Sequence, residues 1–479
     1  MWDPQALCGL VVAGCASGGK SEVADDALLP GDTGDTDLVA DTDRADTDAN
    51  DTDVADTDRA DTDGTDTAAL GVGLPAFCPA PAGDTDVGGA GEPALPRTIT
   101  SATGDTLAVI DGLSAFDFRL FAQTNPSANT VISPLSVSVA LAMTWEGAEG
   151  ATETELANAL GITIPAADWR TSLVDLLADV EGTSRTTGAH VNLANQLFGD
   201  ASFGWRKDFT DRCRDDWGAP FRALSFAPDP DPARLQINDW ARRQTCGLIP
   251  SLFAQGALSP DTPLVLANAL LVEADWSTVF DESATASGDF HLAGGGTRSV
   301  EFMNAELTLA STRPGSFTVA QLPLDGEELG FWVIVPDAAD GLPAIEAAWT
   351  PSAFAGWTAA ATQTRVDLFF PKFQQRTTKD MVAPLQAMGV STLFDSLQAN
   401  LSGMTDAADP LWVSQIAHQA VIVFDERGLR AAAATGVAFV TDTASAPPPE
   451  LRVDRPFLFV LRDELTGLIL FMGRTVDPT

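Results

Sequence analysis

Few residues of this chain have side chains and spacings suited to covalent or proton-transfer chemistry. The chain holds three histidines, His190, His291 and His418, and a serine followed by proline at Ser133. A serine beside a histidine could carry out acyl transfer, with the histidine as general base. The chain has no Gly-x-Ser-x-Gly turn to expose a nucleophilic serine, and Ser133-Pro134 is typical of a helix start. A hydrolase is therefore the least favoured interpretation.

Histidine and cysteine also form no recognisable metal-binding pattern. His190 and His291 have no acidic or cysteine partner at ligand spacing, which favours surface or core roles. The five cysteines show no Cys-x-x-Cys spacing. They are Cys8, Cys15, Cys78, Cys213 and Cys246. Cys213 and Cys246 fall on different predicted helices, so we expect both thiols to be free and buried. We predict no metal and no cofactor.

An acidic repeat fills much of the N-terminal region. The tripeptide Asp-Thr-Asp recurs with a five-residue period, starting at Asp41, Asp46, Asp51, Asp56 and Asp61. Alternating carboxylates could bind calcium, but the glycine and terminal glutamate of a calcium loop are missing. A self-repelling, extended and solvated spacer is the favoured interpretation. We predict a disordered linker over residues 16–98.

The net charge bears on the kinds of partner that the chain can bind. The formal charge is −40, and both the N-terminal region and the remaining chain are acidic. Nucleic-acid binding needs basic stripes that neutralise phosphates, so the charge argues against it and we expect no nucleic-acid partner. No stretch approaches the roughly 20 apolar residues of a membrane span.

A membrane connection remains possible through the N-terminus. The run Leu10–Cys15, LVVAGC, resembles a bacterial lipoprotein signal, in which the cysteine is lipidated and becomes the mature N-terminus. The preceding residues have an aspartate and no lysine or arginine, which is atypical of such signals. Ala16 after the cysteine points to an outer rather than an inner membrane. We expect residues 1–15 to be a lipoprotein signal and the protein to be extracytoplasmic, at the cell surface, in the outer membrane or secreted.

The elements that must position these residues are predicted from about residue 99 to 479. Helical patterns lie over 105–124, 135–145, 152–160, 168–180, 205–217 and 232–244. Strand-like runs lie over 129–132, 188–198, 262–273, 316–323, 330–335, 364–371, 411–424, 457–462 and 467–473. Ser133 and Pro134 should start the second helix, and Thr152 with Glu155 has capping-box spacing in the third. Strands and helices in mixed order indicate an α+β fold with mainly antiparallel sheets.

One stretch near the C-terminus combines a buried strand with unusually small residues. The apolar run 420–424 predicts a strand, and Ala431–Ala434 are four consecutive alanines followed by Thr435. The chain then becomes proline-rich at 447–449. Taken alone, the stretch predicts an Ala-rich loop or a short helix.

Several blocks, in order along the chain, are similar to the serpin family of protease inhibitors. The first is NTVISPLSVSVALAMTWEGAEGATETELANAL at 129–160. The next two are INDWARRQTCGLIPSLF from 237 and TPLVLANALLVEADWSTVF from 262. Later blocks are VDLFFPKF at 366–373, LQAMGVSTLFD at 385–395, HQAVIVFDERGLRAAAATGV at 418–437 and DRPFLFVLRDELTGLILFMGR at 454–474. The resemblance covers 105–477.

This resemblance implies a serpin fold of three mainly antiparallel sheets and eight or nine helices, with a metastable native state. It also implies an exposed reactive-centre loop that a protease cleaves, forming an acyl-enzyme. The loop then inserts into the central sheet and traps the protease covalently. The implied partner is an endopeptidase of the serine or cysteine class, and one monomer is sufficient.

The resemblance assigns a hinge to the Ala-rich stretch. Its residues are Glu426, Gly428, Leu429, Ala431, Ala432, Ala433, Ala434 and Thr435. Small residues suit a segment that must enter a sheet interior, and Gly428 permits the backbone change. Leu429 stands where serpins usually carry Thr or Ser, and Arg430 where Glu is common. We expect Leu429 to point inward and Arg430 to face solvent on the inserted strand.

The loop length places the bait bond. Counting sixteen residues beyond Glu426 predicts cleavage at Asp442–Thr443, which would suit a protease with a basic specificity pocket. A shifted register would put Val440, Thr441 or Ala444 at the bond, suiting proteases with small apolar pockets. The target protease stays open.

Two further clusters are implied by the resemblance. Ser133, Ser136, Asn268 and His418 correspond to the serpin shutter, a polar cluster beneath the central sheet. Trp276 corresponds to the breach, where the loop first enters. The helix over 168–180 offers essentially Arg170 alone as a basic residue, so a glycosaminoglycan cofactor is not expected.

The leading hypothesis is a suicide-substrate protease inhibitor. The alternative is a non-inhibitory serpin that acts as a binding or decoy-substrate module, which the departures at Leu429 and Arg430 favour. The four alanines favour insertion and hence inhibition.

Overall fold

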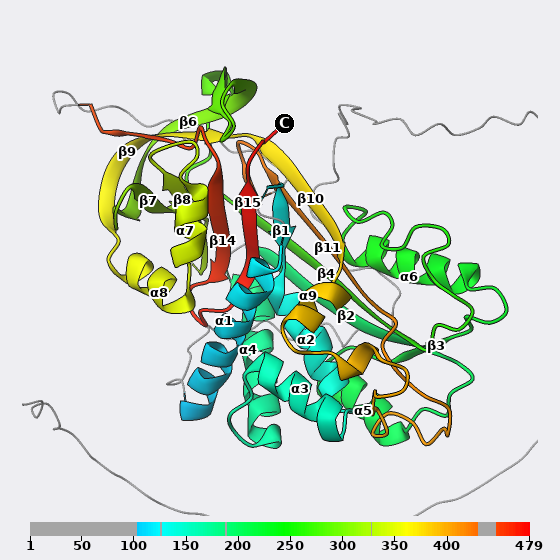
Figure 1. Cartoon of the computed structure of the whole chain (residues 1–479). Coiled ribbons are helices and arrows are strands. Elements are labelled where there is room, and N and C mark those ends of the chain that lie inside the picture. Colours follow the sequence, from blue (N-terminus) through cyan, green and yellow to red (C-terminus); the bar gives the residue numbers. More distant parts are fainter. Residues whose placement is uncertain (1–102, 125–126, 187–188, 327, 430–446) are drawn as a thin grey trace, which may run out of the picture. The chain divides into compact units, whose positions relative to one another are not determined.

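The computed structural model describes residues 103–124, 127–186, 189–326, 328–429 and 447–479 (Figure 1). The predicted signal with Cys15, the acidic linker, Arg430, hinge residues 431–435 and the bait bond Asp442–Thr443 all lie outside the described residues. Those predictions stay predictions.

A six-stranded sheet holds the long buried strands. Its order is β10 (Phe373–Asp380), β11 (Gln415–Phe424), β12 (Gly428–Leu429), β4 (Leu264–Asp275), β2 (His190–Asp200) and β3 (Arg222–Leu224). The β11–β4 and β2–β3 ladders are parallel and the others are antiparallel. Strands β4 and β11 are buried almost throughout, because their apolar runs are covered on both faces of the sheet.

A nine-stranded sheet forms the second layer. Its order is β1 (Thr130–Ile132), β15 (Ile469–Thr475), β14 (Phe457–Asp463), β8 (Leu329–Pro336), β7 (Phe317–Pro323), β6 (Thr297–Thr312), β9 (Thr362–Pro371) and β13 (Glu450–Arg452), with β5 (Ala286–His291) beside β6. The long strand β6 pairs with β5, β7 and β9 at different parts of its length. It therefore joins these strands into one continuous sheet. The two sheets agree roughly with the three expected.

Nine α-helices lie in the described part of the chain. They are α1 (Gly104–Ala122), α2 (Pro134–Trp145), α3 (Gly150–Leu160), α4 (Ala166–Thr186), α5 (Lys207–Asp215), α6 (Asp231–Gln244), α7 (Leu342–Ala348), α8 (Pro351–Ala359) and α9 (Val382–Ala387). Two short 3₁₀ turns, Glu282–Ala284 and Thr392–Phe394, lie in the connections.

Helix α2 is the element that links the two sheets. Every one of its residues is buried, and it contacts β15 of one sheet and β2 and β4 of the other. Ser133 caps it, since its Oγ accepts from the Ser136 amide, and Pro134 occupies the first turn. The predicted helix start is confirmed. Helix α6 covers the opposite face of the six-stranded sheet (Figure 1).

The predicted capping box of α3 is wrong. Glu149 is the residue before the helix, and it makes no side-chain cap hydrogen bond. Thr152 Oγ1 instead accepts from the Asn400 amide at 3.0 Å, and Glu155 accepts from the Ser391 amide at 2.7 Å and from the Thr392 amide at 2.8 Å. These side chains hold a distant loop against the helix, because tertiary partners compete with local caps.

Two other expectations need correction. Cys213 is free and buried as expected, but Cys246 is disulfide-bonded. It lies just after α6 rather than on a helix. Strands β5, β6 and β10 were not predicted, because they have many exposed positions and leave no apolar run.

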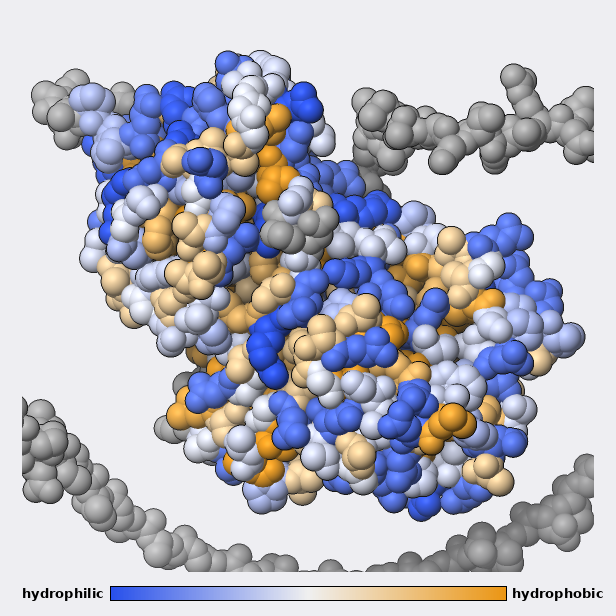
Figure 2. Space-filling view, in the orientation of Figure 1, coloured by the Kyte–Doolittle hydropathy of each residue, from blue (hydrophilic) through white to orange (hydrophobic). Residues whose placement is uncertain are grey.

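The described surface gives no sign of a membrane-spanning helix. No described helix is long and apolar enough to cross a bilayer. Figure 2 shows hydrophobic residues of the visible face in small areas separated by hydrophilic ones. Large hydrophobic side chains that are exposed come from separate segments, namely Leu107, Leu235, Val279, Leu397 and Leu465. Single exposed residues of this kind are ordinary for globular proteins.

Candidate functional site

The predicted polar cluster assembles beneath the junction of β4 and β11. The parallel register sets His418 directly beside Asn268, and His418 Nδ1 lies 2.6 Å from Asn268 Oδ1. The Ser133 amide at the start of α2 donates to His418 Nε2 at 3.1 Å. Ser133 Oγ lies 2.8 Å from Ser136 Oγ. All four side chains are buried. The structure therefore brings together the residues that the sequence grouped.

These contacts decide which nitrogen of the His418 ring carries the proton. A backbone N–H can only donate, so Nε2 is the unprotonated nitrogen and Nδ1 carries the proton that it donates to Asn268. Burial lowers the pKa of His418 to about 3, so the ring is neutral at physiological pH. Ser133 reaches the ring through its amide and not through its hydroxyl. The geometry of a nucleophile with its general base is therefore absent at this cluster.

A fifth residue belongs to this cluster, and the sequence reasoning missed it. In the β2–β4 register Asn195 lies directly opposite Asn268, so their side chains share a face of the sheet. The Oδ1 of Asn195 and the Nδ2 of Asn268 are both buried without a hydrogen-bond partner in the described part of the chain. No local motif marks Asn195. Only the strand register could have found it.

Strand β12 lies where the predicted hinge begins. The chain leaves β11, turns at residues 425–427 and returns as Gly428–Leu429 between β11 and β4. Leu429 pairs with Phe424 of β11 and with Ala274 of β4, and its side chain is 2% exposed. Leu429 therefore points inward in this structure, and its orientation on an inserted strand stays a prediction. Two residues of the predicted hinge, Gly428 and Leu429, thus lie inside the sheet.

Gly428 is required at its position by a close backbone approach. A Cβ atom added there would lie 2.1 Å from the carbonyl oxygen of Ala274 and 2.7 Å from Cα of Asp275. Real carbon atoms do not approach an oxygen so closely. Glycine therefore allows β12 to enter between β11 and β4.

Trp276 fastens the turn to the end of β4. Its Nε1 donates to the carbonyl of Asp425 at 2.8 Å, and its amide donates to the carbonyl of Arg427 at 2.8 Å. Its ring stacks on Phe424 at 6.0 Å and meets other phenylalanines edge-on. The tryptophan predicted at the entry point therefore contacts the turn directly, besides packing in the core.

Glu426 adds an ion pair at the same turn. Its carboxylate accepts from Lys372 Nζ at 2.7 Å and from Thr285 Oγ1 at 2.9 Å. Burial acts to raise the pKa of Glu426, but these hydrogen bonds outweigh it and the pKa is lowered. The carboxylate is therefore ionised at neutral pH and holds the turn to two other segments.

Directly beyond β12, β4 and β11 of the six-stranded sheet are not paired with each other, and no described strand lies between them. The parallel β11–β4 ladder covers only Gln415–Gln419 and Val265–Ala269. Beyond it, Leu270–Val272 of β4 and residues 420–423 of β11 have ladder partners only on their outer sides, from β2 and β10, among the described residues. Unpaired strand edges that face each other form a place for a further strand.

Both faces of this opening are covered. On one face Ile237 and Trp240 of α6 pack in one cluster with Ala267, Ala269 and Val421. On the other face Leu270, Val272 and Ile422 join the core that contains α2. A strand that entered here would be buried on both sides, so small side chains would be favoured.

The remaining candidate residues do not assemble a reactive site. Within the described residues, no group of three or more His, Cys, Asp or Glu side chains could hold a metal ion. His291 contacts the carbonyl of Asp454, and its side chain is 51% exposed. Burial lowers the pKa of His190. Arg170 is paired with Glu146 and Asp216.

Comparison with known proteins agrees with this architecture. The family model described as "Serpin (serine protease inhibitor)" matches residues 111–478. Leukocyte elastase inhibitor of Bos taurus is 34% identical over 376 residues, covering 75% of this chain and 96% of the relative. Serpin B8 of Homo sapiens is 32% identical over 380 residues, covering 78% of this chain and 100% of the relative.

Two solved structures resemble the chain over most of its length. Human thyroxine-binding globulin complexed with thyroxine superposes with a TM-score of 0.71 at 26% identity, covering 78% of this chain and 100% of the other. The thermophilic serpin Tengpin in its native state gives a TM-score of 0.70 at 26% identity, covering 77% and 94%.

Proposed function

The chain belongs to the serpin family, and from that premise we propose that it inhibits an endopeptidase of the serine or cysteine class as a suicide substrate. The family model is described as a serine protease inhibitor and the Bos taurus relative is named an elastase inhibitor, so the protein is an inhibitor-family member rather than an enzyme. The observation that carries the proposal is the position of β12, which pairs with both β11 and β4 above an open stretch of sheet.

The reaction that starts the trap is ordinary peptide-bond cleavage. The protease nucleophile attacks the carbonyl carbon of the bait residue, proposed as Asp442, and forms an acyl-enzyme. The Thr443 amine leaves with a proton. The freed segment then inserts into the sheet while its new C-terminus is still bonded to the protease, which is thereby displaced before water can hydrolyse the ester or thioester.

The register of β12 specifies how the segment would enter. Continuing both ladders, Ala431 comes opposite Val272 and Ile422, and Ala434 comes opposite Ala269 and Gln419. Residues up to 433 therefore enter the existing opening without breaking a strand pairing. Ala434 is the first to meet an intact one, the Gln419–Ala269 pair, and Thr435 then meets His418–Asn268. The shutter resists insertion at this point.

The same register explains how Arg430 can be accommodated. Arg430 comes opposite Glu273 and Val423, on the face that α6 covers. Opposite charges on directly facing residues are favourable across a strand pair. We propose that Arg430 pairs with Glu273 in the inserted state, instead of facing solvent.

The test is incubation with a panel of serine and cysteine endopeptidases, followed by denaturing gels. Inhibition predicts an SDS-stable complex of higher mass, and mass spectrometry of the released C-terminal peptide identifies the bait bond. The alternative is a non-inhibitory binding or decoy module, which the bulky Leu429 at the hinge favours. Cleavage without any complex, across the panel, supports that alternative.

We also propose that the protein is a monomeric lipoprotein outside the cytoplasm, with Cys15 lipidated and residues 16–98 as spacer. A disulfide at Cys246 fits an oxidising compartment. Lipidation would occupy the sulfur of Cys15 and remove Cys8 with the signal, and Cys213 is free. The proposal therefore requires a Cys78–Cys246 disulfide, which peptide mapping under non-reducing conditions tests. A disulfide to Cys15 would exclude lipidation.

A further inference from the structure

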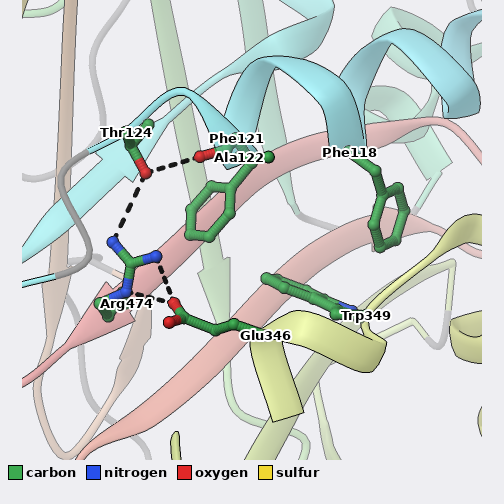
Figure 3. Close-up of a pocket in the computed structure, with 7 residues that line it drawn as sticks. All are labelled: Phe118, Phe121, Ala122, Thr124, Glu346, Trp349 and Arg474. Atoms are coloured by element: carbon green, nitrogen blue, oxygen red, sulfur yellow. Dashed lines mark hydrogen bonds and ion pairs between the residues drawn. The ribbon is translucent and has the colours of Figure 1, made fainter. Parts of the chain in front are cut away.

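An aromatic pocket lies away from the central sheet, where the C-terminal end of α1 meets β15 and the α7–α8 connection (Figure 3). The cavity measures about 230 Å³. Its lining residues are Phe118, Phe121, Ala122, Thr124, Glu346, Trp349 and Arg474. None of them belongs to the insertion site, so ligand binding in this pocket is independent of the proposed inhibitory function.

Three aromatic rings form the apolar wall. The ring centroid of Trp349 lies 5.3 Å from that of Phe118 and 5.2 Å from that of Phe121, both edge-to-face. All three side chains are largely buried, while Ala122 is exposed at the mouth. A cavity of roughly 150 Å³ with apolar walls can hold a benzene ring. This pocket is larger, and so has room for one or two fused rings.

The polar wall carries two charges that neutralise each other. Arg474 and Glu346 form an ion pair, with side chains 4% and 17% exposed. Both contacts from Arg474 end on the same carboxylate oxygen, Oε1, as Figure 3 shows. The other oxygen of Glu346, Oε2, has no hydrogen-bond donor among the residues drawn. It remains an acceptor on the pocket wall.

Further contacts hold Arg474 and Thr124 in place on the polar wall. Arg474 also lies over the Phe121 ring at 5.0 Å and donates to Thr124 Oγ1 at 3.4 Å. Thr124 Oγ1 donates its own proton to the Phe121 carbonyl at 2.7 Å. A ligand carboxylate would be repelled by Glu346, and a ligand ammonium by Arg474. Separating the buried pair to suit either would leave one charge unpaired, at high cost.

We propose that this pocket binds a neutral aromatic molecule of one or two rings that carries an N–H or O–H donor, such as an indole or a phenol. The ring lies among Phe118, Phe121 and Trp349, and the donor points to Glu346 Oε2. A hydrogen bond to a charged acceptor is stronger than one to a neutral acceptor, so the donor selects among aromatic molecules of equal size.

The first experiment locates the site by titrating the full-length protein with indole, using calorimetry and saturation-transfer NMR. We expect a dissociation constant below about 1 mM for a ligand of this size. Ala122→Trp fills the mouth from an exposed helix position and should weaken binding at least tenfold. Gln123→Trp, at the adjacent exposed position that does not line the pocket, is the matched control. Equal binding by Ala122→Trp and the wild type would overturn the proposal.

The second experiment tests the ligand class with indole and indole-3-carboxylate. The wild type should prefer neutral indole by about tenfold or more. Glu346→Gln keeps an acceptor for Arg474 but removes the negative charge, so indole should bind less tightly and the carboxylate more tightly. Thermal unfolding verifies that the variant is folded. A wild type that binds the carboxylate as tightly as indole, or an unchanged preference in Glu346→Gln, would contradict the assignment.

Discussion

His418 shows how a single buried residue makes the fold sensitive to pH. Its folded pKa of about 3 lies below the ordinary value of 6.5. Protonation is therefore easier in the unfolded chain, and the stability that the neutral ring contributes is complete above pH 6.5. That stability falls by about 1.4 kcal/mol per pH unit as the pH drops from 6.5 toward 3.

We expect His418→Gln to be less stable than the wild type at pH 7.5, because the Ser133 and Asn268 contacts are disturbed. The difference should shrink by about 2 kcal/mol at pH 5. Urea unfolding at both pH values measures this. His291→Gln, at a half-exposed ring, is the control. If the difference between His418→Gln and wild type is the same at both pH values, the neutral-ring assignment is wrong.

Asp117 on α1 gives the stability a pH dependence of the opposite sign. Its side chain is buried, its Oδ1 has no hydrogen-bond partner in the described part of the chain, and burial raises its pKa well above 3.8. The unfolded chain loses this proton at lower pH than the folded protein does. Stability is therefore lost as the pH rises from about 3.8 through the folded pKa.

Asp117→Asn should accordingly stabilise the protein at pH 8, by about 1–3 kcal/mol, and have little effect near pH 3.5. Thermal or urea unfolding across this range provides the measurement. Asp111→Asn, at an exposed position of the same helix, is the matched control. A pH-independent effect of Asp117→Asn would rule out a buried ionisable group as the cause.

At the scale of elements, the position of β12 between β11 and β4 depends on Gly428. Gly428→Ala places a methyl group against the Ala274 carbonyl, so we expect β12 to leave the sheet and Leu429 to become exposed. The loss should be about 1–3 kcal/mol. Hydrogen exchange at the Trp276 and Phe280 amides, which bond to the turn, reports the release. Gly204→Ala, where no atom lies within 4 Å of the added carbon, should leave both amides protected. Equal protection in the two variants would show that β12 tolerates the methyl group.

The extended register makes a second prediction for this element. Arg430→Glu and Glu273→Arg each set like charges opposite one another, and each should lower the fraction of protein that forms the SDS-stable complex, by about two- to fivefold. The double variant should regain most of it, since the charges are only exchanged. Gel densitometry with one sensitive protease measures all four proteins. If both single variants form as much SDS-stable complex as the wild type, Arg430 does not pair with Glu273 in the inserted state.

At the scale of the whole molecule, the proposed insertion would add a strand to the six-stranded sheet. Cleavage within 430–446 should therefore raise the unfolding temperature, by at least about 10 °C. Calorimetry before and after cleavage tests this, with mass spectrometry to verify the cut. Ala433→Arg should be cleaved without this gain, because the register points residue 433 into the core beside Leu270 and Ala420. An unchanged unfolding temperature in the wild type would oppose insertion.

Much of the fold could be predicted locally. Helices α1–α6 and the buried strands follow from apolar periodicity, and the start of α2 follows from Ser133-Pro134. The strands β5, β6 and β10 could not be predicted in this way, because a strand with many exposed positions has no continuous apolar run. Thr152 and Glu155 were assigned to a local cap because the loop that they hold, 391–400, is more than 200 residues away.

The sequence by itself determined the family, because many blocks occur in the right order, and the resemblance grouped four members of the polar cluster, Ser133, Ser136, Asn268 and His418. Only the tertiary structure decided how they act. The protonated nitrogen of His418 was fixed by the Ser133 amide, which the packing of α2 brings to the ring. Strand register is a non-local property, so it alone placed Asn195 opposite Asn268 and left the facing edges of β4 and β11 below β12 without ladder partners among the described residues. The same register showed that Leu429 already lies between the strands that the rest of the hinge would separate.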